Sequence, residues 1–127
     1  MKIILCPCGT NHPYSDCCGR YLDSNVIPAT AETLMRSRYT AYTLLSEKYL
    51  LSTWHPSTRP QQLGLADDAS GKWLGLQVKR HEQTDDTHAV VEFVARYKVG
   101  GRAQRMHEVS RFVREDGRWF YVDGDML

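Results

Sequence analysis

The sequence predicts an α+β fold in which helices come first and an antiparallel sheet follows. Residues 29–56 show helical periodicity, and residues 72–125 alternate between apolar and polar side chains as strands do. Gly100-Gly101 and Asp116-Gly117 interrupt the alternating region with two-residue signals of the kind that join hairpins. Helices followed by hairpin-connected strands favour a helical layer packed on one face of the sheet.

Length and charge narrow the class of protein. The chain has 127 residues, which is enough for one sizeable core, and its 16 basic and 15 acidic residues give a net charge of +1. That balance offers no electrostatic basis for binding nucleic acid or an anionic membrane. The apolar run Ile3-Ile4-Leu5 is too short for a signal peptide, and no stretch approaches a bilayer span. We therefore expect a cytoplasmic protein whose partner is a protein or a small molecule.

All four cysteines of the chain fall within thirteen residues, at Cys6, Cys8, Cys17 and Cys18. Disulfides normally close longer loops, whereas two close cysteine pairs separated by a short loop supply the tetrahedral thiolates that zinc prefers. The spacing predicts a structural zinc site, with iron as an alternative occupant of the same sulfurs. Redox pairing of the thiols is the competing interpretation, and His12 is expected to be a bystander.

The metal site divides the chain into two predicted units. Residues 1–28 form a zinc knuckle with almost no core of its own, and residues 29–127 form the helix-and-sheet domain. Because metal binding would supply the folding energy of the knuckle, replacing Cys8 or Cys17 should unfold the knuckle and leave the sheet folded.

The helical region predicts two helices. The first begins after Thr30, a good N-cap, with Glu32 in the first turn facing the positive end of the helix dipole. The second covers Glu47 to Trp54 and ends before His55-Pro56, because the residue before a proline resists helix. Residues 57–71 remain undecided.

The strand region predicts four strands, covering residues 73–81, 88–99, 103–114 and 119–123. The two turns pair Phe93 with Glu108 and Ser110 with Asp123, and alternation then assigns every side chain to a face. The face predicted to lie under the helices collects Val91, Phe93, Ala95, Tyr97, Met106, Glu108, Ser110, Phe112, Trp119, Tyr121 and Asp123. His107 points to the opposite face, so no histidine is expected on the inner one.

The cysteine pairs also resemble a known motif. Cys6-Pro7-Cys8, with eight residues from Gly9 to Asp16 before Cys17-Cys18-Gly19, is similar to the SEC-C motif, the zinc-binding tail also found in the SecA preprotein translocase ATPase. The resemblance continues along nearly the whole chain as one to the YchJ family (UPF0225), through Leu34–Tyr42, Thr53–Pro56, Trp73–Leu76, Phe93–Tyr97, Ser110–Phe112, Gly117–Trp119 and Asp123-Gly124. It implies a SEC-C knuckle followed by an NTF2-like domain, in which a curved antiparallel sheet wraps around helices to form a cone with a pocket.

The predicted cone has its own candidate residues. They are aromatic or charged side chains of the first helix and of the inner sheet face, namely Arg36, Arg38, Tyr39, Tyr42, Tyr97, Glu108, Phe112, Tyr121 and Asp123. A buried carboxylate without a partner is costly, so we expect Arg36 or Arg38 to reach Glu108 or Asp123. Trp54 and Trp73 are expected to seal the junction between helices and sheet.

Three functions remain open at this point. The first is a zinc-containing binding or adaptor protein whose cone holds a small molecule or peptide. The second is a cofactor-free lyase, isomerase or hydrolase that uses the cone carboxylates Glu108 and Asp123 as general base and partner. The third is a redox or metal sensor based on the cysteine thiols. The residues favour the first, and they predict no catalytic group.

Overall fold

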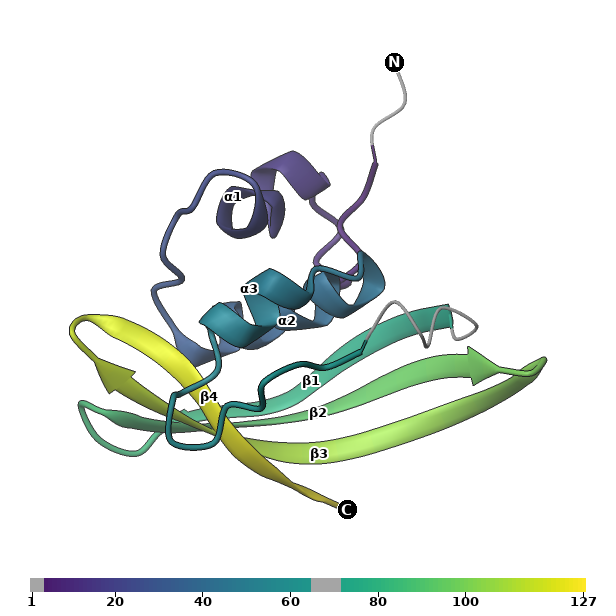
Figure 1. The fold of residues 1–127 in the computed structure, drawn as a ribbon. Helices are drawn as coiled ribbons and strands as arrows, with labels where there is room; N and C mark the ends of the chain where they lie inside the picture. Colours follow the sequence, from purple (N-terminus) through teal and green to yellow (C-terminus); the bar gives the residue numbers. More distant parts are fainter. Residues whose placement is uncertain (1–3, 65–71) are drawn as a thin grey trace.

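A computed structural model describes residues 4–64 and 72–127 and has the α+β architecture that the sequence predicts (Figure 1). The segment 65–71, part of the undecided connection, lies outside the described residues. The elements in chain order are η1 (Tyr14–Asp16), α1 (Gly19–Leu22), α2 (Ala31–Thr43), α3 (Glu47–Ser52), β1 (Lys72–Gln83), β2 (His88–Val99), β3 (Arg102–Glu115) and β4 (Arg118–Met126).

These elements form layers around α2. Helices α2 and α3 lie across one face of the sheet, and α1 lies farther from the sheet than they do (Figure 1). Helix α2 begins as predicted, since the Thr30 hydroxyl accepts a hydrogen bond from the Thr33 backbone N–H at 3.1 Å. Helix α3 ends two residues before the predicted Trp54, because Trp54 leaves the helix to form a parallel bridge with Tyr121 of β4.

The sheet has four antiparallel strands in the order β1-β2-β3-β4. The hairpin at Gly100-Gly101 has the predicted register, with Val99 opposite Arg102 and Phe93 opposite Glu108. The hairpin at Asp116-Gly117 also begins as predicted, with Phe112 opposite Tyr121. All four strands extend to or beyond their predicted ends, by up to three residues.

A β-bulge in β4 changes the far end of the second hairpin. Tyr121 pairs with Phe112, but Asp123 pairs with the adjacent Arg111, so Val122 is an extra residue. The expected pairing of Ser110 with Asp123 is therefore wrong, and Gly124 stands opposite Ser110 instead. Since one inserted residue reverses the alternation, Asp123 moves to the outer face of the sheet.

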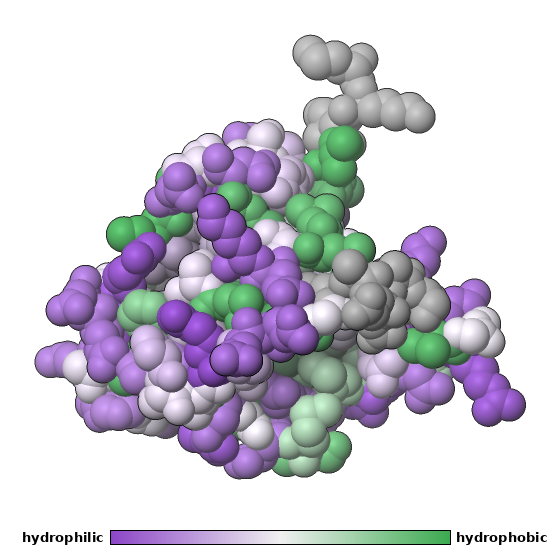
Figure 2. All heavy atoms as spheres, viewed as in Figure 1, coloured by the Kyte–Doolittle hydropathy of each residue, from purple (hydrophilic) through white to green (hydrophobic). Residues whose placement is uncertain are grey.

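The core joins the cysteine loop to the sheet. One cluster of buried residues includes Cys6, Cys8 and Cys18, residues of α2, and the inner face of the sheet around Val91 and Phe112. On the surface, hydrophobic residues appear in small groups separated by hydrophilic ones on the face shown in Figure 2. Among the described helices, none has the length and hydrophobicity needed to cross a bilayer.

Candidate functional site

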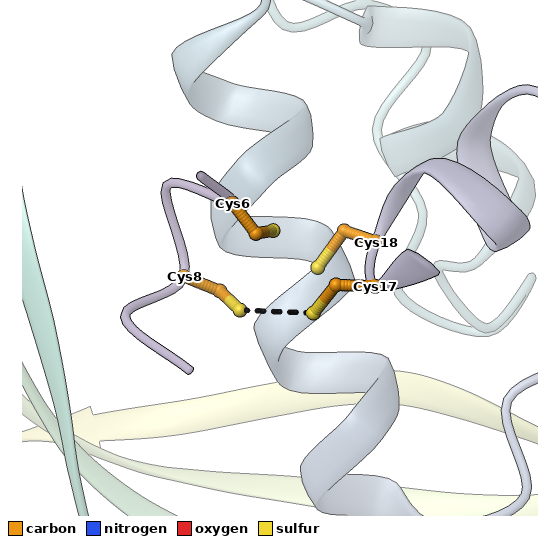
Figure 3. A group of neighbouring side chains, drawn as sticks. All are labelled: Cys6, Cys8, Cys17 and Cys18. Carbon is orange, nitrogen blue, oxygen red and sulfur yellow. Dashed lines mark hydrogen bonds between the residues drawn. The ribbon is translucent and has the colours of Figure 1, made fainter. Parts of the chain in front are cut away.

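The four cysteine sulfurs form a compact cluster, as Figure 3 shows. Their Sγ atoms all lie within 4.8 Å of one another, and those of Cys8 and Cys17 are 3.6 Å apart. A tetrahedral zinc site with Zn–S bonds of about 2.3 Å has S···S edges of about 3.8 Å, so the four sulfurs fit one ion after a small adjustment. His12 is not part of this group of ligand atoms. The predicted ligands are thus brought together by the fold.

Two short backbone segments hold the cluster. The Cys6 N–H donates to the carbonyl of His12 at 2.9 Å, which closes the loop that carries Cys6 and Cys8. Cys17 and Cys18 come immediately before α1. Gly9, with φ +87°, lets the loop approach β1 closely, because a Cβ there would lie 3.3 Å from the Leu76 carbonyl oxygen.

Hydroxyl groups surround the sulfurs. The Thr10 Oγ1 lies 3.2 Å from the sulfur of Cys17 and 3.7 Å from that of Cys8, and the buried Thr40 Oγ1 of α2 lies 3.6 Å from the sulfur of Cys6. A hydrogen bond from Cys18 lowers the pKa of Cys8 to about 4, whereas that bond and burial raise the pKa of Cys18. Metals bind the thiolate form, which the lowered pKa of Cys8 supplies.

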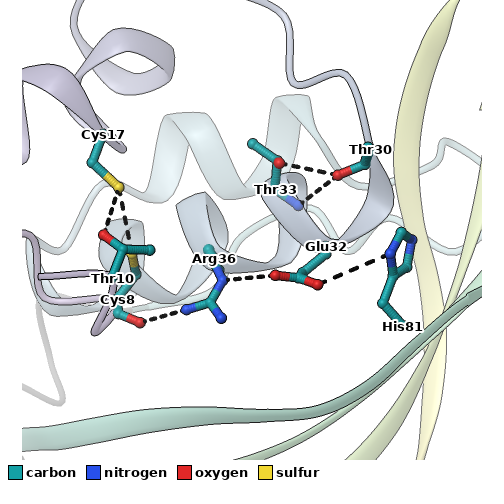
Figure 4. A network of polar contacts seen from close by, with 8 residues as sticks. All are labelled: Cys8, Thr10, Cys17, Thr30, Glu32, Thr33, Arg36 and His81. Atoms are coloured by element: carbon teal, nitrogen blue, oxygen red, sulfur yellow. Dashed lines mark hydrogen bonds and ion pairs between the residues drawn. The ribbon is translucent and has the colours of Figure 1, made fainter. Parts of the chain in front are cut away.

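Arg36 connects the cysteine loop to α2, as Figure 4 shows. Its Nη1 donates to the Cys8 carbonyl at 2.9 Å, and its Nε donates to Glu32 at 3.1 Å. Glu32 also lies 4.0 Å from Nδ1 of His81, which stands opposite Val91 on the inner face. The expectation that this face carries no histidine is therefore wrong. Nε2 of His81 is buried without a hydrogen-bond partner among the described residues.

A pocket of about 260 Å³ lies between α2 and the inner face of the sheet. Its described walls come from α2 and from all four strands, so both layers shape it. They are Met35, Arg38, Tyr39, Tyr42, Trp73, Phe93, Ala95, Met106, Glu108, Ser110, Phe112 and Tyr121. Trp73 packs edge-on against Tyr39, with ring centroids 5.6 Å apart, and contacts the ring of Tyr42 at 6.0 Å.

Glu108 is the carboxylate that lines the pocket, and it occupies space that is free because residue 124 is a glycine. Its Oε2 accepts a short hydrogen bond from the Ser110 hydroxyl. A Cβ on Gly124 would lie 2.6 Å from the same oxygen, so the bulge that places Gly124 here also permits this position of Glu108. No hydrogen bond to the second oxygen, Oε1, occurs among the described residues.

Arg38 is the pocket's cation and is only 5% exposed. Its Nη1 donates to the Leu50 carbonyl at 2.8 Å and to the Thr53 hydroxyl at 2.7 Å, and its guanidinium carbon lies 4.6 Å from the ring centroid of Tyr121. Burial lowers the pKa of Arg38, while the surrounding tyrosines and Glu108 raise it. Within the described part of the chain, Nε and Nη2 have no hydrogen-bond partner.

The predicted arginine–carboxylate pairs do not form. Arg36 binds the cysteine loop, and Arg38 binds the C-terminal end of α3, whose last carbonyls lack partners within the helix. Asp123 lies on the outer face, where its Oδ1 accepts from Nε of Arg111 at 2.5 Å. Its separation from Glu108 removes the carboxylate pair that the catalytic interpretation requires.

The structure sorts the remaining candidates. Arg38, Tyr39, Tyr42, Glu108, Phe112 and Tyr121 line the pocket, whereas Arg36, Tyr97 and Asp123 do not. Tyr97 is a neighbour of the pocket through Trp73, at 5.5 Å between ring centroids. Trp54 packs edge-on against Tyr121 at 4.9 Å, so both tryptophans lie at the junction of helices and sheet.

Sequence reasoning missed several pocket residues. They are Met35, Trp73, Phe93, Ala95, Met106 and Ser110, which are not among the candidate residues of the predicted cone. Alternation already assigns Phe93, Ala95, Met106 and Ser110 to the inner face, so the signal is present in the sequence. What alternation does not reveal is where the inner face stays unfilled.

Comparison with known proteins agrees with this arrangement. The SEC-C motif matches residues 4–20, and the family described as YchJ, middle NTF2-like domain, matches residues 30–124. The chain belongs to the YchJ (UPF0225) family. A UPF0225 protein of Ralstonia nicotianae is 60% identical, covering 95% of this chain and 90% of its own length. Another UPF0225 protein, from Chromobacterium violaceum, is 62% identical and covers 94% of this chain and 90% of its own length.

Two solved structures share the fold. The solution structure of a SEC-C motif containing protein from Rhodopseudomonas palustris has a TM-score of 0.88 at 34% identity, covering 98% of this chain and 99% of that one. The crystal structure of a SEC-C motif containing protein from Psychrobacter arcticus has a TM-score of 0.80 at 31% identity, covering 94% and 80%. The N-terminal motif and the NTF2-like domain therefore occur together in related chains.

Proposed function

We propose that this YchJ-family protein is a zinc-stabilised binding protein whose NTF2-like cone holds a small molecule. The observation that carries the proposal is the pocket between α2 and the sheet, whose wall is mostly aromatic and aliphatic and whose charged groups are confined to Arg38 and Glu108. Binding sites for small molecules typically combine a mostly apolar wall with a few oriented polar groups.

The metal has a structural role in this proposal. Cys6 and Cys8 share one buried cluster with residues of α2, and Arg38, Tyr39 and Tyr42 of the same helix form part of the pocket. The four-sulfur set fits zinc, and the donor set leaves no position for a catalytic water. Zinc at the cysteines would thus fix the helix that forms one wall of the cone.

The test is a fragment screen against zinc-loaded protein by ligand-observed NMR, with amide chemical-shift mapping of each hit. Ala95→Leu fills the pocket from β2, where Ala95 is 1% exposed, and Ala103→Leu is the matched control at an exposed position of β3. We expect hits that shift residues of the pocket and that are lost in Ala95→Leu but retained in Ala103→Leu. Thermal unfolding of both variants verifies that they fold. A screen without pocket-directed hits would refute the proposal.

A further inference from the structure

The size and walls of the pocket limit the shape of its occupant. A cavity of about 150 Å³ is enough to hold benzene, so the 260 Å³ here admits one ring or two fused rings. Its aromatic walls are Tyr39 and Tyr42 of α2 and Trp73, Phe93 and Phe112 of the sheet. Aromatic side chains pack favourably against planar rings in stacked or edge-on arrangements.

The charges limit the polarity of the occupant. Of the described lining residues, Arg38 and Glu108 are the charged ones, and they interact with each other electrostatically. A neutral occupant leaves these opposite charges balanced. An anion or a cation would add a buried charge without a counter-charge of its own, which is costly in a low-dielectric site.

The hydrogen-bonding capacity of the same two residues limits the occupant further. Nε and Nη2 of Arg38 lack partners among the described residues and can only donate, so they call for an acceptor. Oε1 of Glu108 is likewise unpartnered there and calls for a donor. An occupant that offers one of each would satisfy both residues.

We infer that the cone binds a neutral, planar aromatic or heteroaromatic molecule of one or two rings whose polar edge carries both a hydrogen-bond donor and an acceptor. A lactam or amide edge has this chemistry. The inference rests on the proposed function and adds the class of ligand to it. Arg38 and Glu108 are the specificity-determining residues.

Four two-ring probes of similar size test the inference by calorimetric or NMR titration. They are 2-quinolone, with adjacent N–H and C=O groups, quinoline, which only accepts, naphthalene, which does neither, and the anion 2-naphthoate. We expect 2-quinolone to bind at least about tenfold more tightly than the other three, because each of them loses a hydrogen bond or adds a buried charge.

Glu108→Gln separates charge from shape. The substitution keeps the size of the side chain and leaves Arg38 without its counter-charge, so the ratio of the 2-quinolone to the 2-naphthoate affinity should shift at least about tenfold toward the anion. Glu92→Gln is the matched control, because Glu92 lies in β2 on the outer face and pairs with His107 at 2.7 Å. Its affinity ratio should equal that of the unmodified protein.

The outcomes distinguish the ligand class from the pocket itself. Tighter binding of 2-naphthoate or naphthalene than of 2-quinolone overturns the ligand class, as does an unchanged ratio in Glu108→Gln. Both results leave a functioning pocket. If none of the four probes binds while other fragments do, the ligand class is again wrong. If no fragment binds at all, the proposed function fails with it.

Discussion

Gly124 affects the pocket because it has no side chain and so leaves space for a neighbouring carboxylate. The bulge at Val122 places it opposite Ser110, and the space that a Cβ would fill holds the carboxylate of Glu108. The bulge that moves Asp123 out of the cone is therefore the same one that admits Glu108. A single inserted residue thus decides which carboxylate the pocket contains.

Gly124→Ala should disturb the pocket without breaking the fold. The new Cβ would lie 2.6 Å from Oε2 of Glu108, so the carboxylate must move away from the position in which it accepts from Ser110. We expect a loss of about 1–3 kcal/mol in the free energy of unfolding, as for other overpacked sites, together with weaker ligand binding. Urea unfolding measures the first effect and titration of any ligand found in the screen measures the second.

Gly75→Ala is the control for that experiment. Gly75 lies in β1, and a Cβ there would have no neighbour within 4 Å. Its free energy of unfolding should change by no more than about 1 kcal/mol, since the substitution mainly restricts the unfolded chain. An equal loss in both variants would show that Glu108 is free to move and that the close approach at Gly124 has no consequence.

At the scale of elements, α2 connects the two sites. The helix contacts the cysteine loop through Thr40, whose hydroxyl lies near the Cys6 sulfur, and through the hydrogen bond from Arg36 to the Cys8 carbonyl. Its inner side presents Arg38, Tyr39 and other residues to the pocket. Because Cys6, Cys8 and Cys18 share one core cluster with α2 and the sheet, the loop is not an independent appendage.

Metal removal should therefore lower stability beyond the loop. We expect one zinc per chain by elemental analysis, and none bound stably in Cys17→Ser. Loss of the metal should unfold the cysteine loop and lower the Tm by about 10 °C or more, because a ligand that binds only the native state stabilises it. The near-UV circular dichroism of the sheet aromatics should persist at low temperature, as the sequence already predicted for the domain after residue 28.

Ser15→Ala, at an exposed position of the same loop, provides the control and should retain both the metal and the Tm. Four freely reactive thiols and no metal in native, reduced protein would refute the metal site. A Tm unchanged by loss of the metal would show instead that the loop and the domain are energetically separate.

For the whole molecule, the buried tyrosines predict the response to alkaline pH. Burial raises the pKa of Tyr39, Tyr49 and Tyr121 to about 12, from an ordinary value of about 10. Tyr121 is held further in its neutral form by Glu108, against the opposing effect of Arg38. In the unfolded chain these phenols ionise near pH 10.

The sign of the effect follows from that difference. A group whose pKa is higher in the folded state contributes stability below its unfolded pKa and loses it as the pH rises through the folded value. The contribution of these tyrosines to stability against urea should therefore be constant below about pH 9 and fall between about pH 10 and 12. Tyrosinate absorbance and near-UV circular dichroism should change together in that range. Full ionisation of every tyrosine near pH 10 with the fold intact would contradict the burial.

The sequence by itself determined the class of fold and the clustering of the four cysteines. Helical and strand periodicities differ, so the order of helices and strands could be inferred from residue spacing alone. Glycine-containing turns fix hairpin register, which explains why Phe93 opposite Glu108 was predicted and found. The cysteines lie so close in the chain that few folds could separate their sulfurs.

The tertiary structure decided the contents of the cone. Whether Asp123 points inward depends on one bulge, and regular alternation cannot anticipate an inserted residue. Arg36 donates to a carbonyl group of the cysteine loop, and Arg38 donates to one of α3. These acceptors come within reach only when the elements pack together. The pocket itself is volume that the side chains of two packed layers leave unfilled. The local sequence specifies which side chains face the core. The distance between the helical layer and the sheet determines where those side chains leave a cavity.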